Sequence, residues 1–296
     1  MQSVSIVGCG YTGRRLAARW LTLGARVRGF ATRAGSLAQI AAVGAEAVLL
    51  DLDAPPGAAP AMAPRAFDGQ IVYYMVPPAK DSDGDPRLTR YLDALAGVPR
   101  RFIYLSTTGV YGDQAGGVVD EDTPPAPQTG RAARRVAAEH AVRAWAEARG
   151  VSWCILRVPG IYGPGRLPLE RLRRGEPAIV REEATPGKRI HVADLVTVCM
   201  AAGVAAVADG RIYNVTDGSE DSLTEYLLRV ADIAKLPAPP LVSRADAKRA
   251  LSESSWSFLA ESRRVDNRRM LDELGVALEF HDLDAGIRAS LVDTQE

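Results

Sequence analysis

A glycine-rich loop near the start of the chain constrains the fold more than any other feature of the sequence. Gly8, Gly10 and Gly13 form the pattern G-x-G-x-x-G directly after the apolar residues 4–7. Apolar residues at helical spacing follow, until Gly24 ends the pattern. In this context the first glycine permits a tight turn, the second lets the backbone approach a pyrophosphate, and the third lets helix and strand pack closely. The loop therefore predicts a dinucleotide site at the N-terminus of a helix.

Strand and helix patterns alternate from residue 3 to residue 157. Because such alternation needs crossover connections, we predict an α/β fold: a doubly wound parallel sheet of the Rossmann type with helices on both faces. The Pro- and Ala-rich stretch 53–64 is predicted to be loop. Strands are predicted at residues 4–7, 26–30, 47–50, 71–76, 101–105 and 153–156, and helices at 16–23, 37–43, 88–95 and 131–149.

The alternation breaks down after Pro159, where proline and glycine become frequent. A strand at 212–215 and a helix at 222–233 are still predicted. We interpret the irregular part as a smaller C-terminal substrate lobe that covers the carboxyl edge of the sheet. The predicted Rossmann domain spans residues 1–158, with 190–215 returning to it, and the predicted lobe spans residues 159–189 and 216–296.

The end of the second predicted strand bears on which dinucleotide is bound. The acid that usually contacts the ribose of NAD lies about 20 residues beyond the glycine loop, but no Asp or Glu occurs between Gly13 and Glu46. Thr32 and Arg33 stand there instead, and an arginine suits a ribose 2′-phosphate. We therefore predict a preference for NADP, with NAD as the alternative. A solvated surface charge without a ligand is the competing interpretation of Arg33.

Composition argues against several classes of function. The chain has 36 basic and 36 acidic residues and a formal net charge of zero, so we expect no nucleic-acid partner. No apolar run reaches membrane-spanning length, and the N-terminus has no signal-peptide pattern. Three scattered cysteines outside any C-x-x-C pattern suit a reducing compartment. We expect a cytoplasmic protein without a membrane anchor, and without a metal site because no cluster has metal-ligand spacing.

Further motifs follow the glycine loop in a fixed order. They are Leu50-Asp51-Leu52, LSTTGVYG at 105–112, RVPGIYGPG at 157–165, IHVADL at 190–195 and Tyr213-Asn214-Val215. With these motifs the chain resembles the NAD-dependent epimerase/dehydratase family, the extended short-chain dehydrogenases/reductases. The likeness covers nearly the whole chain, and the second and third motifs in this order are its most specific part.

The resemblance implies roles for individual residues. Asp51 is placed beside the adenine, Val76 and Pro77 along the cofactor, and Pro159 near the nicotinamide. Thr107 is implied to supply the active-site hydroxyl. Together with the glycine loop and the second strand, the predicted cofactor-binding residues are Gly8, Gly10, Tyr11, Thr12, Gly13, Thr32, Arg33, Asp51, Val76, Pro77 and Pro159.

One part of the family pattern is missing. The family usually carries a catalytic Tyr-x-x-x-Lys at the start of the helix after the fifth strand, but residues 127–139 contain neither Tyr nor Lys. Arg134 or Arg135 falls near the Lys position, and an arginine cannot shuttle a proton because it stays protonated. The family's usual glycine loop is also G-x-x-G-x-x-G. Both departures indicate an atypical branch, and general acid–base catalysis typically contributes about 10²–10⁴-fold in rate.

Two tyrosines outside that helix are the candidate proton donors. Tyr111 lies on the same loop as Thr107, and Tyr162 lies on the loop expected to face the nicotinamide. Packing is the alternative role for each. His191 is interpreted as structural, with catalysis as the minor alternative. The ring of Tyr11 is expected either over the cofactor phosphates or packed against the protein.

Two functions stay open from the sequence. The first is an NAD(P)-dependent oxidoreductase or epimerase-like enzyme that acts on a small polar carbonyl or alcohol. The second is a non-catalytic protein that binds the dinucleotide as a redox sensor or structural element. Thr107 and the Tyr-Gly-Pro-Gly loop favour the first, and the missing Tyr and Lys favour the second.

The helix at 131–149 is predicted to form part of a homodimer interface. Its Ala137, Ala141 and Trp145 fall on one stripe, and the equivalent helix often builds a dimer in the family that the chain resembles. Burial of the same stripe in the core is the alternative.

Overall fold

The computed structural model describes residues 1–54, 66–80, 82–253, 256 and 259–292. Its centre is a seven-stranded sheet in which every neighbouring pair of strands is parallel. In spatial order the strands are β3 (Glu46–Leu49), β2 (Arg26–Ala31), β1 (Ser3–Val7), β4 (Ile71–Tyr74), β5 (Arg101–Thr107), β7 (Ser152–Val158) and β11 (Arg211–Asn214). The predicted doubly wound α/β fold is confirmed.

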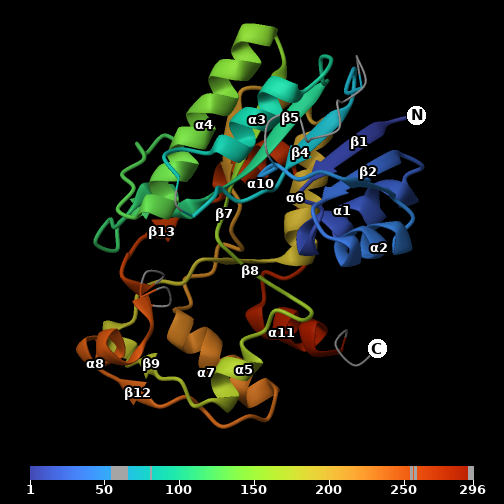
Figure 1. Ribbon diagram of the computed structural model, residues 1–296. Coiled ribbons are helices and arrows are strands. Elements are labelled where there is room, and N and C mark those ends of the chain that lie inside the picture. Colours follow the sequence, from blue (N-terminus) through green and yellow to red (C-terminus); the bar gives the residue numbers. More distant parts are fainter. Residues whose placement is uncertain (55–65, 81, 254–255, 257–258, 293–296) are drawn as a thin grey trace.

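Helices cover both faces of this sheet (Figure 1). One face is covered by α1 (Tyr11–Thr22), α2 (Ala34–Ala42), α6 (Val192–Val204) and α10 (Arg268–Leu274). The other face is covered by α3 (Pro86–Ala94) and α4 (Gly130–Arg149). Because both faces are buried, a central strand such as β4 is apolar or aromatic at every position and buried throughout.

Close packing of α1 on the sheet depends on small residues. A Cβ at Gly13 would lie 3.1 Å from Ile6 Cγ2, and a Cβ at Gly29 would lie 2.9 Å from Cys9 Sγ. Cys9 is itself buried between the helix and the sheet. The third glycine of the loop therefore lets the helix and strand approach each other closely.

A smaller lobe lies beyond the carboxyl edge of the sheet, in the lower part of Figure 1. Its core gathers apolar side chains from α5, α7 and α11, among them Leu172, Leu227 and Ile287. The lobe elements are α5 (Leu169–Arg173), β9 (Ala178–Ile179), α7 (Leu223–Ile233), β12 (Leu241–Val242), α8 (Arg244–Ala250) and α11 (Leu283–Val292). The remaining short elements are η1 (Thr108–Tyr111), β6 (Val118–Val119), β8 (Gly160–Tyr162), η2 (Arg181–Glu183), β10 (Arg189–His191), η3 (Ala206–Ala208) and β13 (Arg264–Val265).

Three features differ from the predicted elements. Helix α6 was not predicted, because its residues are apolar on nearly all sides and give no helical period. Residues of α10 fall in the stretch 216–296 that was assigned to the lobe, yet Met270 and Leu274 pack in the core of the sheet domain. Helix α1 begins at Tyr11, earlier than the apolar period indicated. Residues 55–64 of the predicted loop lie outside the described residues.

The three cysteines are buried and unpaired. Burial raises the pKa of each thiol, which makes Cys9, Cys154 and Cys199 poor nucleophiles. Within the described part of the chain, no helix is long and apolar enough to cross a membrane. The same residues contain no group of three or more His, Cys, Asp or Glu side chains that could hold a metal ion.

Candidate functional site

A cavity of about 430 Å³ opens at the carboxyl edge of the sheet, beside the ends of β1 and β4. The chain order reverses between these two strands, which is where open α/β sheets bind their ligands. Many of the predicted cofactor residues line it. They are Gly8, Gly10, Thr32, Arg33, Asp51, Val76 and Pro77.

The backbone at this cavity suits an anion. Gly8 has a φ of +81°, and a Cβ there would lie 3.0 Å from the backbone nitrogen of Val76. The N–H groups of Gly8 and Cys9 both donate to the carbonyl oxygen of Phe30, at 3.2 and 2.9 Å, which fixes the turn. Helix α1 then begins with no side-chain cap and no acidic residue in its first turn. Its first N–H groups and the positive end of its dipole therefore fit a pyrophosphate.

A second helix N-terminus borders the same cavity. Arg33 is the N-cap residue of α2, whose first turn also lacks an acidic residue, and Ser36 of that turn lines the cavity. Asp51 and Asp53 line the cavity as well. An ion pair of 2.5 Å joins Asp53 to Arg87, and the Arg87 hydrogen bond holds the pKa of that carboxyl below its usual value.

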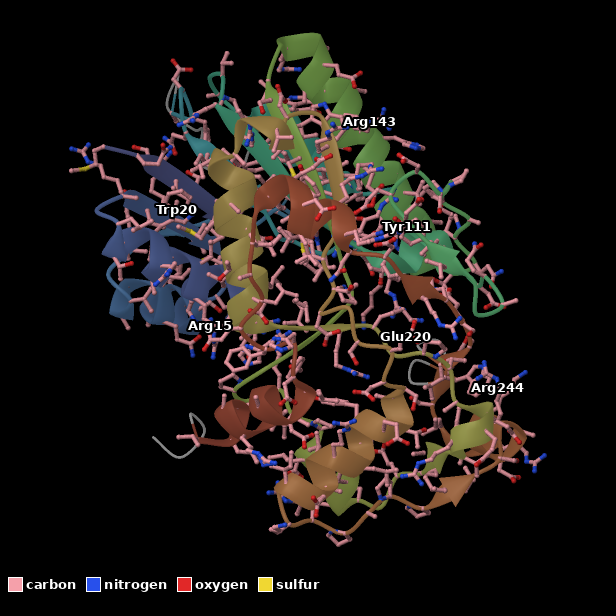
Figure 2. The ribbon with its side chains drawn as sticks, turned by 180° about the vertical axis from the view of Figure 1, so that it is seen from behind. Arg15, Trp20, Tyr111, Arg143, Glu220 and Arg244 are labelled. Carbon is pink, nitrogen blue, oxygen red and sulfur yellow. The ribbon has the colours of Figure 1, made fainter. Side chains whose placement is uncertain are left out.

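Tyr11 joins the sheet domain to the lobe. Its ring lies between two guanidinium groups, with the Arg15 and Arg166 carbons 4.0 and 4.1 Å from the ring centroid. Arg15 belongs to α1 and lies on the side of the sheet domain that faces the lobe (Figure 2). A Cβ at Gly163 would lie 2.7 Å from the Tyr11 hydroxyl. These contacts favour the packing alternative for the ring.

A second cavity, of about 470 Å³, lies between the sheet edge and the lobe. Thr107 and Pro159 line its sheet side, and Tyr162, Leu223 and Tyr226 line its lobe side. Its wall is strongly basic, which favours a negatively charged ligand. The charged residues among the described lining are Arg131, Arg166, Arg171, Lys188, Arg189 and Arg263, against the carboxylate Glu261.

Thr107 stands at the mouth of this cavity, at the end of β5. Its hydroxyl oxygen accepts a hydrogen bond of 3.1 Å from the N–H of Gly109 and so caps η1. The proton of that hydroxyl has no acceptor among the described residues. Thr107 can therefore donate a hydrogen bond to a substrate oxygen.

Tyr111 is held in a buried polar network. Its hydroxyl donates to Asn214 Oδ1 at 2.8 Å and accepts from Arg157 Nη1 at 2.9 Å. Arg157 in turn pairs with Glu139 at 2.8 Å, and Ser106 donates to the same carboxylate. The Tyr111 side chain is fully buried, and burial raises its pKa. Because it does not line the second cavity, this placement favours the packing alternative over proton donation.

Tyr162 lines the cavity, but its hydroxyl lies against the lobe. The ring contacts His191 and Tyr226 edge to face, and the hydroxyl is close to Gly286 of α11. The hydroxyl is buried and has no hydrogen-bond partner in the described part of the chain. Burial raises the pKa of Tyr162 well above its ordinary value, which makes it a weak proton donor.

His191 caps a helix. Its Nδ1 accepts the N–H of Ala193 at 3.2 Å and so caps α6. Its ring lies 4.0 Å from that of Phe280, centroid to centroid. Burial lowers the pKa of His191 to about 4, so it is neutral at pH 7. This geometry agrees with the structural interpretation.

Comparison with known proteins settles the family. Residues 4–216, most of the chain, match the sequence profile of the NAD dependent epimerase/dehydratase family. The chain belongs to this family. Its similarity to known proteins extends over both the sheet domain and the lobe.

Three similar proteins illustrate this. Protein YeeZ of Escherichia coli (strain K12) is 26% identical over 288 residues, which are 95% of this chain and 97% of that protein. A functionally unknown conserved protein from Silicibacter pomeroyi DSS is 33% identical, with a TM-score of 0.83 and all of both chains covered. A UDP-glucuronic acid 4-epimerase from Bacillus cereus, solved in complex with NAD, is 16% identical with a TM-score of 0.76 and 99% of each chain covered. At that identity the last likeness shows the fold alone.

The resemblance seen in the sequence implies a Tyr-x-x-x-Lys at the start of α4. This helix is described in full and contains neither residue. Arg135 Nη1 instead donates to the Tyr104 hydroxyl at 2.9 Å and to the Leu105 carbonyl at 2.8 Å, which ties it to β5. Arg131 faces the second cavity.

The sequence analysis missed the basic wall of the second cavity. Its cations come from segments that lie between residues 131 and 263, in a chain with no net charge. The one sequence signal was Lys188-Arg189, which directly precedes the motif at 190–195 and includes one of four lysines in the chain.

Proposed function

We propose that this chain is a dinucleotide-dependent oxidoreductase or epimerase-like enzyme of the cytoplasm that prefers NADP(H) and acts on a small polar carbonyl or alcohol. The observation that carries the proposal is the position of the two cavities. The first lies beside the ends of β1 and β4, and the second begins at Thr107 and Pro159, at the ends of β5 and β7. The residues of the first cavity would hold a dinucleotide, which would supply or accept a hydride at the second.

The residues around the two cavities support distinct roles. The backbone from Gly8 to Gly13 would hold the pyrophosphate, and Asp51, Val76 and Pro77 the adenosine half. Pro159 would lie near the nicotinamide. The hydroxyl of Thr107 would orient the substrate oxygen. The basic wall supports a substrate that carries a negative charge.

The preference for NADP(H) is supported by Arg33 at the N-terminus of α2, together with Thr32 and Ser36. A charge-assisted hydrogen bond contributes about 1.5–3 kcal/mol, which corresponds to roughly tenfold to a hundredfold in affinity. Calorimetry should therefore show tighter binding of NADPH than of NADH, and Arg33→Ala should remove the difference. Arg26→Ala is the matched control, because Arg26 is exposed at the other end of β2. Equal affinities for both dinucleotides would refute the preference.

The catalytic part of the proposal is tested by turnover. With NADPH and a panel of anionic aldehydes and ketones, Thr107→Ala should lower kcat/KM while NADPH affinity stays unchanged. A Thr107→Ala variant with full kcat/KM would mean that the hydroxyl does not orient the substrate.

A non-catalytic role as a dinucleotide sensor is the second candidate, and the α4 helix without Tyr or Lys favours it. A sensor would bind the oxidised and reduced dinucleotides without consuming NADPH on any member of the carbonyl panel.

A further inference from the structure

Lys188 lies where the lobe meets the edge of the sheet. Strand β10 begins at the next residue and pairs in parallel with β8, and a Cβ at Gly160 would lie 3.4 Å from the Lys188 carbonyl oxygen. Pro159 directly precedes Gly160, and the end of β7 is in register with Thr107 of β5. Two strand pairings thus bring Lys188, Pro159 and Thr107 to one cavity.

The Lys188 amine has no hydrogen-bond or ion-pair partner among the residues that the structure describes. Glu261 is already paired with Arg263 at 2.6 Å, and Asp113 accepts the N–H of Ser262 at 2.7 Å. The pKa of Lys188 is lowered to about 7, mainly by burial and also by the charge of Arg263, while Glu261 and Asp113 act in the opposite direction. Near neutral pH, therefore, the ammonium and the neutral amine coexist.

The other charged groups around Lys188 do not neutralise it. The cavity wall adds only cations, namely Arg131, Arg166, Arg171 and Arg189. A hollow on the other side of Lys188 is lined by Glu220, Arg264, Asp266 and Arg268. These four form ion pairs with each other, Arg264 with Glu220 at 3.3 Å and Arg268 with Asp266 at 2.5 Å.

The cavity has few other groups that could move a proton. The two tyrosines that line it are Tyr162 and Tyr226, and burial raises the pKa of each well above its ordinary value. The arginines stay protonated, and the carboxylate of Glu261 is held by Arg263. Among the described lining residues, Lys188 is the group that can both give and take a proton near neutral pH.

We propose that Lys188 is the proton-transfer residue of the substrate cavity, an assignment that rests on the proposed function. In the reducing direction the Lys188 ammonium gives a proton to the carbonyl oxygen while the carbonyl carbon accepts a hydride. The carbonyl becomes a hydroxyl, and the neutral amine regains its proton from solvent. In the oxidising direction the neutral amine takes the hydroxyl proton, and the hydride passes to an oxidised nicotinamide dinucleotide, which would be reduced. A reduced nicotinamide dinucleotide, when bound, supplies the hydride and becomes oxidised.

The titration of Lys188 can be measured without turnover. The chain contains only four lysines, so reductive methylation with carbon-13 formaldehyde gives a small set of resolved NMR signals. One lysine signal should titrate near pH 7, and the signal of the methylated N-terminal amine is told apart because it persists in Lys188→Met. The lysine signal near pH 7 should be absent from Lys188→Met.

Turnover then tests the proton transfer itself. Lys188→Met should lower kcat about 10²–10⁴-fold and leave NADPH affinity unchanged, because Lys188 does not line the nucleotide cavity. Lys188→Arg keeps the positive charge but cannot transfer a proton, so its kcat should stay low. Lys235→Met, at an exposed position, is the matched control and should keep full kcat.

The outcomes separate this proposal from the proposed function. Full kcat in Lys188→Arg would show that only the positive charge matters. A Lys188 signal that titrates near pH 10 would show that the amine does not exchange a proton near neutral pH. Either result would overturn the assignment and leave the proposed function standing. An unaltered protein that binds NADPH but turns over no carbonyl would overturn both.

Discussion

The buried pair of Arg157 and Glu139 yields a quantitative prediction about stability. Both side chains are 3% exposed, and Arg157 donates two hydrogen bonds to the carboxylate and one to Tyr111. Arg157→Met leaves a buried carboxylate with the hydroxyl of Ser106 as its remaining side-chain partner. Removing one partner of a buried pair typically costs about 3–5 kcal/mol, a large fraction of the roughly 5–15 kcal/mol of a whole domain.

Protonation sets an upper limit on this cost. A glutamate carboxyl in water has a pKa of about 4.3. Each pH unit above that value adds about 1.36 kcal/mol to the cost of protonating it, so the cost at pH 7 is roughly 4 kcal/mol. At pH 5 the same uptake costs only about 1 kcal/mol. The loss of unfolding free energy in Arg157→Met should therefore fall from roughly 4 kcal/mol at pH 7 to about 1 kcal/mol at pH 5.

Urea unfolding followed by circular dichroism at both pH values measures this loss. The double variant Arg157→Met with Glu139→Leu is the control, because replacing both charges by apolar groups should recover most of the lost stability. A penalty that does not change with pH, or a double variant as unstable as the sum of the two single ones, would refute the reasoning.

Three further predictions concern other parts of the molecule. His191 has a pKa lowered to about 4 in the folded chain, so below pH 6.5 the unfolded chain binds a proton that the folded chain does not, and stability falls as the pH falls. His191→Asn keeps a capping side chain. Between pH 6 and 4.5 it should reduce the dependence of unfolding free energy on pH by up to about 1.4 kcal/mol per unit, as measured by urea unfolding. An unchanged dependence would contradict this prediction. Tyr111→Phe should lower the free energy of unfolding by about 1–2 kcal/mol, because Asn214 loses a hydrogen-bond donor. Tyr162→Phe removes a hydroxyl that has no hydrogen-bond partner among the described residues, so stability and kcat should stay nearly unchanged. A large fall in kcat for Tyr162→Phe would restore Tyr162 as the proton donor. Helix α4 should form part of a homodimer interface. Light scattering at roughly 50 μM, where a modest interface still holds, should show a dimer that Ala141→Arg disrupts. A monomer before substitution would disprove the prediction.

The stripe predicted on the helix at 131–149 is divided between the core and the surface. Trp145 was grouped with Ala137 and Ala141, yet its ring packs 5.4 Å from that of Phe102 in the core of the sheet domain. Ala137 remains exposed, and Ala141 is partly buried. A sequence stripe gives the apolar side of a helix, but it cannot say whether the sheet or another subunit covers each residue.

The sheet domain was predictable because its signals are local. A glycine loop after a strand, or an apolar run such as residues 71–74, identifies a secondary-structure element from a few consecutive residues. The second cavity was not predictable in the same way, because Thr107, Lys188 and Arg263 meet only through strand pairing and lobe packing. The role of Tyr111 was hidden for the same reason, since its partner Asn214 belongs to the last strand of the sheet.

The pairing of β10 with β8 has a consequence for how this scaffold changes over evolution. The pairing is made by backbone atoms, whose hydrogen bonds do not depend on which side chains the two strands carry. Residues such as Arg166, Arg171 and Lys188 can therefore be exchanged while the lobe stays attached to the sheet and the nucleotide cavity stays intact. If the proposed function holds, the cavity that would bind the cofactor can stay constant while the residues of the second cavity diverge, so a new substrate would not require a new fold.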